Sequence, residues 1–225
     1  MTIKVGINGF GRIGRCTLSH IARSGRDDIE VVKLNATGPV ETAMHLLKYD
    51  SVHGRFPNEI TIGDGFVNIG QNDIEMMSSY DLDALDWSGC DVVLECTGQF
   101  NDGEKADAHI RNGAKKVLLS GPGVNVDRTV VYGVNDHEML PSDVMISNGS
   151  CTTNCLAPLA KVMHEAVGIQ SGIMTTIHSY TGDQYTLDKR HKDLYRARAA
   201  AMAIIPTSTG AAKALGQVMP ELKGI

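Results

Sequence analysis

The sequence has no excess of positive charge and no long apolar segment. Its 225 residues include 21 lysines and arginines against 26 aspartates and glutamates, for a formal net charge of −5. This balance gives no bulk electrostatic attraction toward nucleic acid or an anionic membrane. No apolar run approaches the roughly 20 residues that a membrane-spanning helix needs. We therefore expect neither nucleic acid nor a membrane as a partner.

The sequence also lacks repeats, low-complexity segments, a secretory signal pattern and metal-type cysteine spacing. Its five cysteines are an odd, scattered set: Cys16, Cys90, Cys96, Cys151 and Cys155. We therefore expect a reduced, cytoplasmic location and no metal site. The length fits one large domain or two small ones, and a hydrophobic fraction of 42% is ordinary for a globular protein.

A glycine motif follows the first strand-like segment. Residues Ile3–Ile7 predict a buried strand, and Gly9, Gly11 and Gly14 then form G-x-G-x-x-G at the start of a helical pattern that runs to about Ser24. A second strand is expected at Ile29–Leu34. A plain glycine-rich turn is the alternative, but inside a βαβ unit the motif favours a dinucleotide site, with pyrophosphate at the helix N-terminus.

Further strands alternate with helix in the same half. Strands are expected at Asp91–Glu95, Lys116–Leu119 and Thr129–Val134, and a helix at Glu104–Asn112. This alternation predicts an α/β fold with a parallel sheet whose carboxyl strand ends bind ligands. The less regular region between Asp50 and Trp87 suggests no chemistry.

The segment Ser147–Cys155 places Cys151 between a strand, Val144–Ser147, and a helix. Apolar residues recur at helical spacing after it, at Leu156, Leu159, Ala160, Met163 and Val167. A helix N-terminus lowers a thiol pKa and favours the thiolate. A buried, inert cysteine is the alternative, but the hydroxyl-rich setting favours a reactive one. We expect Cys155, four residues later, to be a packing residue.

A second candidate for chemistry is His178, at the end of an expected strand, Gly172–Ile177. A lone histidine is more often structural, and the residues alone do not place it beside Cys151. Thr209 and Gly210 precede another helical pattern, where a hydroxyl caps the helix or holds an anion.

The run Ser-Asn-x-Ser-Cys-Thr-Thr-Asn-Cys-Leu-Ala-Pro around Cys151 resembles the active-site signature of phosphorylating glyceraldehyde-3-phosphate dehydrogenases, and the resemblance extends over the whole chain. It implies a Rossmann-type dinucleotide-binding domain over residues 1–149 and, over residues 150–225, the N-terminal part of an α+β catalytic domain. It also implies a homotetramer, with glyceraldehyde 3-phosphate and inorganic phosphate as partners.

The resemblance also assigns roles. It makes Cys151 the nucleophile and His178 the base, with Arg12 and Ile13 against the cofactor and Ser120 near its nicotinamide. The residues that match phosphate ligands of the family are Ser150, Thr152, Thr181, Arg196, Thr209 and Gly210.

Two departures from the NAD-using members bear on the cofactor. Those members carry Asn-Asp after the second strand, where this chain has Asn35-Ala36-Thr37. A carboxylate there would repel a 2′-phosphate by about 4 kcal/mol at 4 Å in a surface dielectric, and Ala36 removes that repulsion. The hydroxyl of Thr37 is a possible donor.

The second departure is Lys189-Arg190, where those members have a small apolar pair in a loop that reaches a neighbouring subunit's adenosine ribose. Two cations there suit a 2′-phosphate, although solvated loop charges are the alternative. The two departures favour NADP or dual use over strict NAD.

Family members continue for roughly a third of their length beyond the point that matches Ile225, and we expect the strand Gly172–Ile177 to lack partners here. Two alternatives to a phosphorylating triose-phosphate enzyme therefore stay open. One is a non-catalytic dinucleotide-binding fragment, and the other is an erythrose-4-phosphate dehydrogenase, which the segment Thr209–Lys213 disfavours because it keeps the triose-phosphate form.

Overall fold

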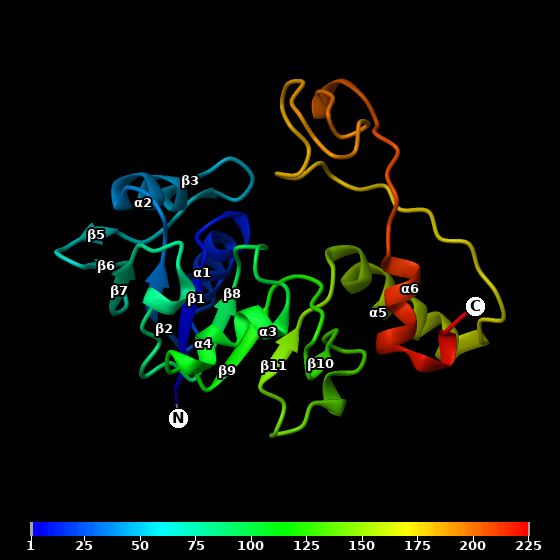
Figure 1. The fold of residues 1–225 in the computed structure, drawn as a ribbon, viewed down its shortest axis with the longest axis horizontal. Helices are drawn as coiled ribbons and strands as arrows, with labels where there is room; N and C mark the ends of the chain where they lie inside the picture. Colours follow the sequence, from blue (N-terminus) through cyan, green and yellow to red (C-terminus); the bar gives the residue numbers. More distant parts are fainter. Residues whose placement is uncertain (1, 225) are drawn as a thin grey trace. The chain divides into compact units, whose positions relative to one another are not determined.

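A largely parallel sheet dominates the first of two units in this computed structural model, which describes residues 2–224. The first unit ends at Cys151 and the second begins at Thr152. Over the described residues the sheet has nine strands in the order β10-β11-β9-β8-β1-β2-β7-β6-β5. Figure 1 shows these strands in the blue-to-green part of the chain.

The parallel strands are β1 (Ile3–Asn8), β2 (Ile29–Asn35), β7 (Asp73–Met77), β8 (Val92–Glu95), β9 (Lys116–Leu119), β10 (Arg128–Thr129) and β11 (Met145–Ser147). Two antiparallel strands, β5 (Thr61–Ile62) and β6 (Phe66–Asn68), extend one edge. A separate hairpin joins β3 (Tyr49–Asp50) to β4 (Gly54–Arg55). This order, with β1 between β2 and β8, is that of a Rossmann fold and confirms the predicted α/β class.

Helices and short 3-10 turns lie between the strands along the chain. They are α1 (Arg12–Ser24), α2 (Val40–Lys48), α3 (Gly103–Ala106) and α4 (Ala108–Arg111), with single 3-10 turns η1 (Leu82–Ala84) and η2 (Asp136–Glu138). Helix α1 buries Gly14, Leu18 and Ile21 against the sheet and ends at Gly25 in the left-handed region. The predicted helix Glu104–Asn112 is divided at Asp107 into α3 and α4.

The expected strand Thr129–Val134 is mostly wrong. Strand β10 ends at Thr129, and the chain then turns because Asn135 accepts from the backbone N–H of Val131 at 2.9 Å and donates to the carbonyl of Thr129 at 3.0 Å. This asparagine closes a loop where the β-branched run alone predicted an extended chain.

The second unit contains α5 (Cys151–Val167, whose first residue closes the first unit), η3 (Ala200–Met202), α6 (Ala211–Val218) and η4 (Pro220–Leu222), and no strand is found among its described residues. Figure 1 shows a long irregular segment between α5 and α6. The predicted strand Gly172–Ile177 is wrong: it forms no β-pairing, and Ile173 and Ile177 are 100% and 96% exposed. A strand requires a hydrogen-bonding neighbour, and this segment has none in the part of the unit that is described.

The helix predicted after Cys151 is present, but its expected apolar face is largely exposed. Leu159, Met163 and Val167 are 58%, 50% and 80% exposed, whereas Ala157 and Ala160 are buried. The periodicity thus predicted the helix correctly and its burial incorrectly. Across the described residues, no helix has both the length and the apolar character needed to cross a membrane.

Candidate dinucleotide and catalytic site

The three glycines that follow β1 differ in what a side chain at each position would contact. Gly9 has φ +95°, and a Cβ there would lie 2.8 Å from the backbone nitrogen of Thr97. A Cβ on Gly14 would lie 2.2 Å from the carbonyl oxygen of Gly9. A Cβ on Gly11 would meet no atom within 4 Å. The first and third glycines therefore allow close backbone packing, and the second leaves open space where a pyrophosphate fits.

A cavity of about 330 Å³ lies at the carboxyl ends of β1, β2 and β8, next to this turn. Its size suits part of a dinucleotide. Of the predicted cofactor residues, Gly9, Gly11, Ala36 and Thr37 line it. The other lining residues are Asn8, Phe10, Asn35, Gly38, Pro39, Thr42, Ala43, Leu46, Ser79, Tyr80, Leu82, Cys96, Thr97, Gln99 and Phe100.

No charged side chain is present among the residues described as lining this cavity. Ala36 is 7% exposed and its backbone N–H donates to the carbonyl of Met77 at 3.0 Å, which fixes its methyl group at the wall. The wall therefore provides neither a carboxylate for ribose hydroxyls nor a cation for a 2′-phosphate. The side-chain donors that line it, such as the hydroxyl of Thr37, are neutral.

Arg12 forms an ion pair with Asp50, a residue outside the regions where the sequence suggested chemistry. Asp50 also accepts from the backbone N–H groups of Val52 and His53, each at 2.8 Å. The bond from His53, with those from Arg12 and Val52, holds the pKa of Asp50 well below its usual range. Ile13, beside Arg12, is 50% exposed. The contact of Arg12 and Ile13 with a cofactor stays a prediction.

Sequence reasoning missed a buried polar group beneath the cavity. Asn8, Asn35 and Glu95 are between 0% and 4% exposed, and each is the last residue of its strand. The sequence did contain a signal for this group, because each of the three is a polar residue at the end of a mostly apolar segment. Ser120, a predicted cofactor residue, follows β9 and its N–H donates to the carbonyl of Glu95 at 3.0 Å.

Cys151 is the first residue of α5, as predicted, and it is exposed. The preceding turn passes through Gly149, whose φ of +67° suits glycine and whose N–H donates to the hydroxyl of Ser147 at 3.1 Å. Ser150 and Thr152 flank the cysteine and are half-buried. Cys155 is exposed, so the expectation of a packing residue is wrong.

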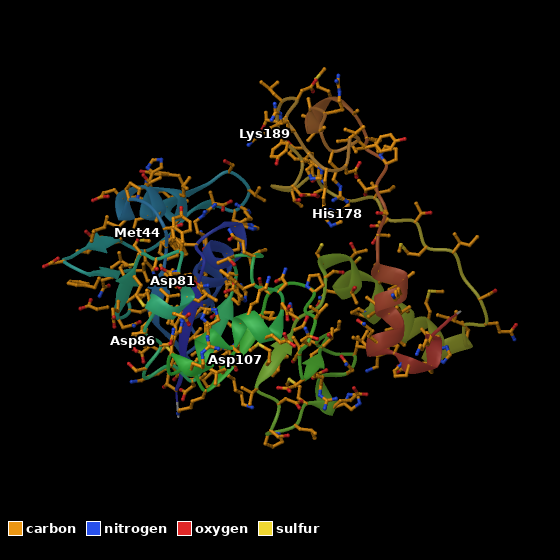
Figure 2. The ribbon with its side chains drawn as sticks, in the orientation of Figure 1. Met44, Asp81, Asp86, Asp107, His178 and Lys189 are labelled. Atoms are coloured by element: carbon orange, nitrogen blue, oxygen red, sulfur yellow. The ribbon has the colours of Figure 1, made fainter. Side chains whose placement is uncertain are left out.

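His178 lies on the irregular segment between α5 and α6, as does Lys189 (Figure 2). The Nδ1 atom of His178 lies 2.6 Å from the carbonyl oxygen of Ser179. A carbonyl only accepts, so this contact assigns the ring proton to Nδ1. Cys151 closes the first unit and His178 belongs to the second, so their pairing stays a prediction.

Arg196, a predicted phosphate ligand, lies in a cluster of charges within the second unit. Its Nη1 donates to Asp183 at 2.7 Å, and Asp193 lies 3.5 Å from its Nε. Asp183 also contacts His191 at 3.2 Å, and these bonds, with that of His191 the largest, lower the pKa of Asp183. Asp183 and His191 are therefore further candidate site residues, which no sequence motif indicated.

The remaining predicted phosphate ligands have local partners in the second unit. Thr181 donates through its hydroxyl to the side-chain oxygen of Gln184 at 3.2 Å. The hydroxyl of Thr209 accepts from the N–H of Ala211 at 3.2 Å, and Gly210 immediately precedes α6. Thr209 thus makes a capping contact, which does not exclude anion binding.

Lys189 and Arg190 are both exposed. The Nζ of Lys189 lies 4.7 Å from the ring centroid of Tyr185, a cation–π contact, and its backbone N–H donates to Ala197 at 3.0 Å. This turn therefore presents two cations at a surface. Among residues 2–224, no group of three or more His, Cys, Asp or Glu side chains has an arrangement that would hold a metal ion.

Comparisons with known proteins show which family the chain belongs to. Residues 3–103 match the family model "Glyceraldehyde 3-phosphate dehydrogenase, NAD binding domain", and residues 150–225 match "Glyceraldehyde 3-phosphate dehydrogenase, C-terminal domain". Glyceraldehyde-3-phosphate dehydrogenase of Cereibacter sphaeroides is 60% identical over 100% of this chain and 67% of its own length. The protein of the same name from Xanthobacter flavus is 57% identical over 100% of this chain and 68% of its own length. The chain thus spans about two thirds of the length of these relatives.

Proposed function

Because the chain belongs to the glyceraldehyde-3-phosphate dehydrogenase family, we propose that its residues serve the phosphorylating oxidation of glyceraldehyde 3-phosphate to 1,3-bisphosphoglycerate. The observation that carries this proposal is a glycine turn with open space at Gly11 beside a cavity, in the same chain as an exposed cysteine at a helix N-terminus. A nicotinamide dinucleotide, when bound, supplies the hydride acceptor.

Cys151 acts as the nucleophile in this proposal. Its thiolate attacks the aldehyde carbon, and the carbonyl π electrons move to oxygen to give a hemithioacetal. His178 removes the hydroxyl proton, and the C–H bond breaks with its electron pair leaving as hydride for the dinucleotide that would be bound, which leaves a thioester on Cys151. The oxygen of inorganic phosphate then attacks the thioester carbon, and the Cys151 sulfur leaves. The N–H groups at the start of α5 favour the oxyanion and the thiolate.

Two anions must be held for this sequence, the phosphate group of the substrate and the attacking phosphate. We assign them to the hydroxyls of Ser150, Thr152, Thr181 and Thr209, the backbone at Gly210, and the guanidinium of Arg196. Arg196 already faces two carboxylates, so a phosphate would compete with Asp183 and Asp193 for it.

We further propose that the cofactor is NADP or that both dinucleotides are used. The uncharged cavity wall supports this assignment, because nothing in it repels a 2′-phosphate. The wall contains no cation either, so the attraction would come from Lys189 and Arg190 of a neighbouring subunit in a homotetramer. A cytoplasmic location is part of the same proposal.

The proposed function is tested by steady-state reduction of NADP and of NAD with glyceraldehyde 3-phosphate, with and without inorganic phosphate. We expect phosphate-dependent turnover that Cys151→Ser abolishes and Cys155→Ser, a matched exposed cysteine, leaves intact. Dinucleotide binding is expected to survive both substitutions.

Equal turnover by Cys151→Ser would reject the nucleophile. Dinucleotide binding without turnover would favour a non-catalytic binding module instead. Faster turnover with erythrose 4-phosphate would assign the chain to the erythrose-4-phosphate dehydrogenases.

A further inference from the structure

Glu95 is a fully buried carboxylate at the end of β8, and the proposed chemistry makes no use of it. Its side chain is 0% exposed. Its Oε1 accepts from the backbone N–H of Thr97 at 2.7 Å and from the Thr97 hydroxyl. Its Oε2 accepts from Asn8 Nδ2 at 2.5 Å and contacts His109 Nε2 at 2.9 Å. A buried carboxylate is costly unless it is fully hydrogen-bonded, and this one has four partners.

The hydrogen bonds of Glu95 continue directly into the wall of the cavity. Asn8 accepts through Oδ1 from Asn35 Nδ2 at 2.7 Å. Asn35 also donates to the carbonyl of Ser79 at 2.9 Å and accepts from the Ser79 N–H at 3.0 Å. Asn8, Asn35, Ser79 and Thr97 all line the cavity. One carboxylate therefore connects the ends of β1, β2 and β8 with the segment that follows β7.

This arrangement also determines which group donates and which accepts in each hydrogen bond from Glu95 through Asn8 to Asn35. An ionised carboxylate only accepts, so Asn8 must turn its NH₂ group toward Glu95 and its carbonyl toward Asn35. Asn35 must then use its own NH₂ group toward Asn8 and its carbonyl toward Ser79. The Ser79 backbone orients Asn35 in the same sense, so Glu95 and Ser79 together determine which amide atoms remain on the cavity side.

His109 closes the far side of the network. It is 0% exposed and its ring meets the ring of Trp87 edge-on, with 5.7 Å between centroids. Its Nδ1 is buried and has no hydrogen-bond partner in the described chain, residues 2–224. The ring proton therefore belongs on Nε2, where it is donated to Glu95, because a proton on Nδ1 would be a buried donor without an acceptor.

We propose that Glu95 is a positioning residue for the dinucleotide. It acts through Asn8 and Thr97, setting the direction of the hydrogen bonds along the wall that the cofactor faces. This inference rests on the proposed dinucleotide binding and adds a residue outside the glycine motif to it.

The test moves the carboxylate from residue 95 to residue 8 in the full chain and compares the single and double variants. Binding of NAD and of NADP is measured by calorimetry. In Glu95→Gln, the new NH₂ group faces the NH₂ group of Asn8, and we expect at least a tenfold loss of affinity for both dinucleotides. In Asn8→Asp/Glu95→Gln, the new NH₂ group would donate to the new carboxylate, and the remaining amide oxygen would still accept from Thr97. Because the new carboxylate stands in the cavity wall, we expect this double variant to bind more tightly than Glu95→Gln but more weakly than the original chain. Glu30→Gln, on a partly exposed glutamate early in β2, is the matched control and should change nothing.

The outcomes separate the two proposals. If the unaltered chain binds neither dinucleotide, the proposed function fails and this inference fails with it. If that chain binds and Glu95→Gln binds equally well, the inference alone is overturned. A folded double variant that binds no more tightly than Glu95→Gln also overturns it, because transposition restores the direction of the hydrogen bonds along the wall.

If Glu95→Gln does not fold, the milder Thr97→Val replaces it. That change removes one hydroxyl donor to Glu95 and leaves the backbone donor in place. A threefold or larger loss of affinity at an unchanged thermal midpoint supports the inference, and unchanged affinity overturns it.

Discussion

Several β-branched and leucine side chains are buried in the sheet of the first unit, whereas isoleucines on the irregular segment of the second unit are exposed. In the first unit Ile7, Leu34 and Val93 are each 0% exposed, whereas in the second unit Ile173 and Ile204 are 100% and 95% exposed. The buried residues belong to strands with hydrogen-bonded neighbours, and the exposed ones lie on irregular chain. An apolar, β-branched segment therefore has a high propensity for strand, but it forms a strand only where a neighbouring segment is present to hydrogen-bond with it.

Polar side chains differ between the units in the same way. The carboxylate of Glu95 is buried and both of its oxygens are hydrogen-bonded, whereas Asp183, which contacts Arg196 and His191, is 51% exposed. Buried pairs are worth more than exposed ones, because solvent screens the latter. The hydrogen bonds around Glu95 therefore hold its neighbours in fixed orientations. The exposed contacts of Asp183 can be replaced by a bound anion.

The largest expected effect is a contrast in stability between matched truncations. Leu34→Ala should lower the free energy of unfolding by about 3 kcal/mol, because it leaves a cavity in the core. Ile177→Ala should change it by less than about 0.5 kcal/mol, since that side chain is 96% exposed. Urea unfolding followed by the fluorescence of Trp87, the single tryptophan, measures the first unit directly. Equal costs would contradict the contrast between the units.

A second contrast separates packing from ligand access within the glycine turn. Gly14→Ala should cost about 2 kcal/mol of stability, because its Cβ would overlap the carbonyl of Gly9. Gly11→Ala should leave the thermal midpoint unchanged and weaken dinucleotide binding at least tenfold, because it fills the space proposed for pyrophosphate. Thermal unfolding and calorimetric titration measure both effects. Loss of stability in Gly11→Ala would show that this space is not reserved for a ligand.

A third experiment asks which unit determines the cofactor. Ala36→Asp should shift the preference toward NAD by at least tenfold, or about 1.4 kcal/mol, by placing a carboxylate in the uncharged wall. Lys189→Ala/Arg190→Ala should lower the affinity for NADP and leave that for NAD unchanged. The ratio of the two dissociation constants is the measurement. An unchanged ratio in Ala36→Asp would show that residue 36 does not discriminate.

The smallest expected effect is the acid dependence of one surface pair in the first unit. The bond from Lys33, with those from Ser88, lowers the pKa of Asp86 to about 2 (Figure 2). A carboxyl whose pKa is lowered by folding contributes stability above its ordinary pKa, and that contribution is lost as the pH falls from about 4 to about 2. Asp86→Asn should therefore make the stability less dependent on pH in this interval. A steeper acid loss in the variant would contradict the assignment.

The sequence predicted the order of elements around the glycine turn well, because each element has a local signal. The period of the apolar residues, the glycines and the polar strand ends all lie within a few residues of the structure they specify. Strand β9 and helix α1 were predicted with the bounds that the structure has, apart from the helix start at Arg12. The turn at Asn135 was missed, since it depends on one side chain that competes with strand pairing.

The candidate site was predictable where a motif spans it and not where contacts join distant residues. Gly9, Gly11 and Cys151 stand in motifs, whereas the contact of Glu95 with Asn8 and that of Arg12 with Asp50 connect residues far apart in the sequence. Asp183 and His191 lacked a signal for the same reason. Burial on α5 and Gly172–Ile177 depends on neighbouring surfaces, which periodicity does not specify.

The position of the cavity-lining residues in the sequence, between Asn8 and Phe100, affects how the chain can evolve by recombination. All of its lining residues come from one continuous stretch of the first unit. A recombination event that exchanges the chain after that stretch would transfer the whole wall, separately from the sequence that carries Cys151.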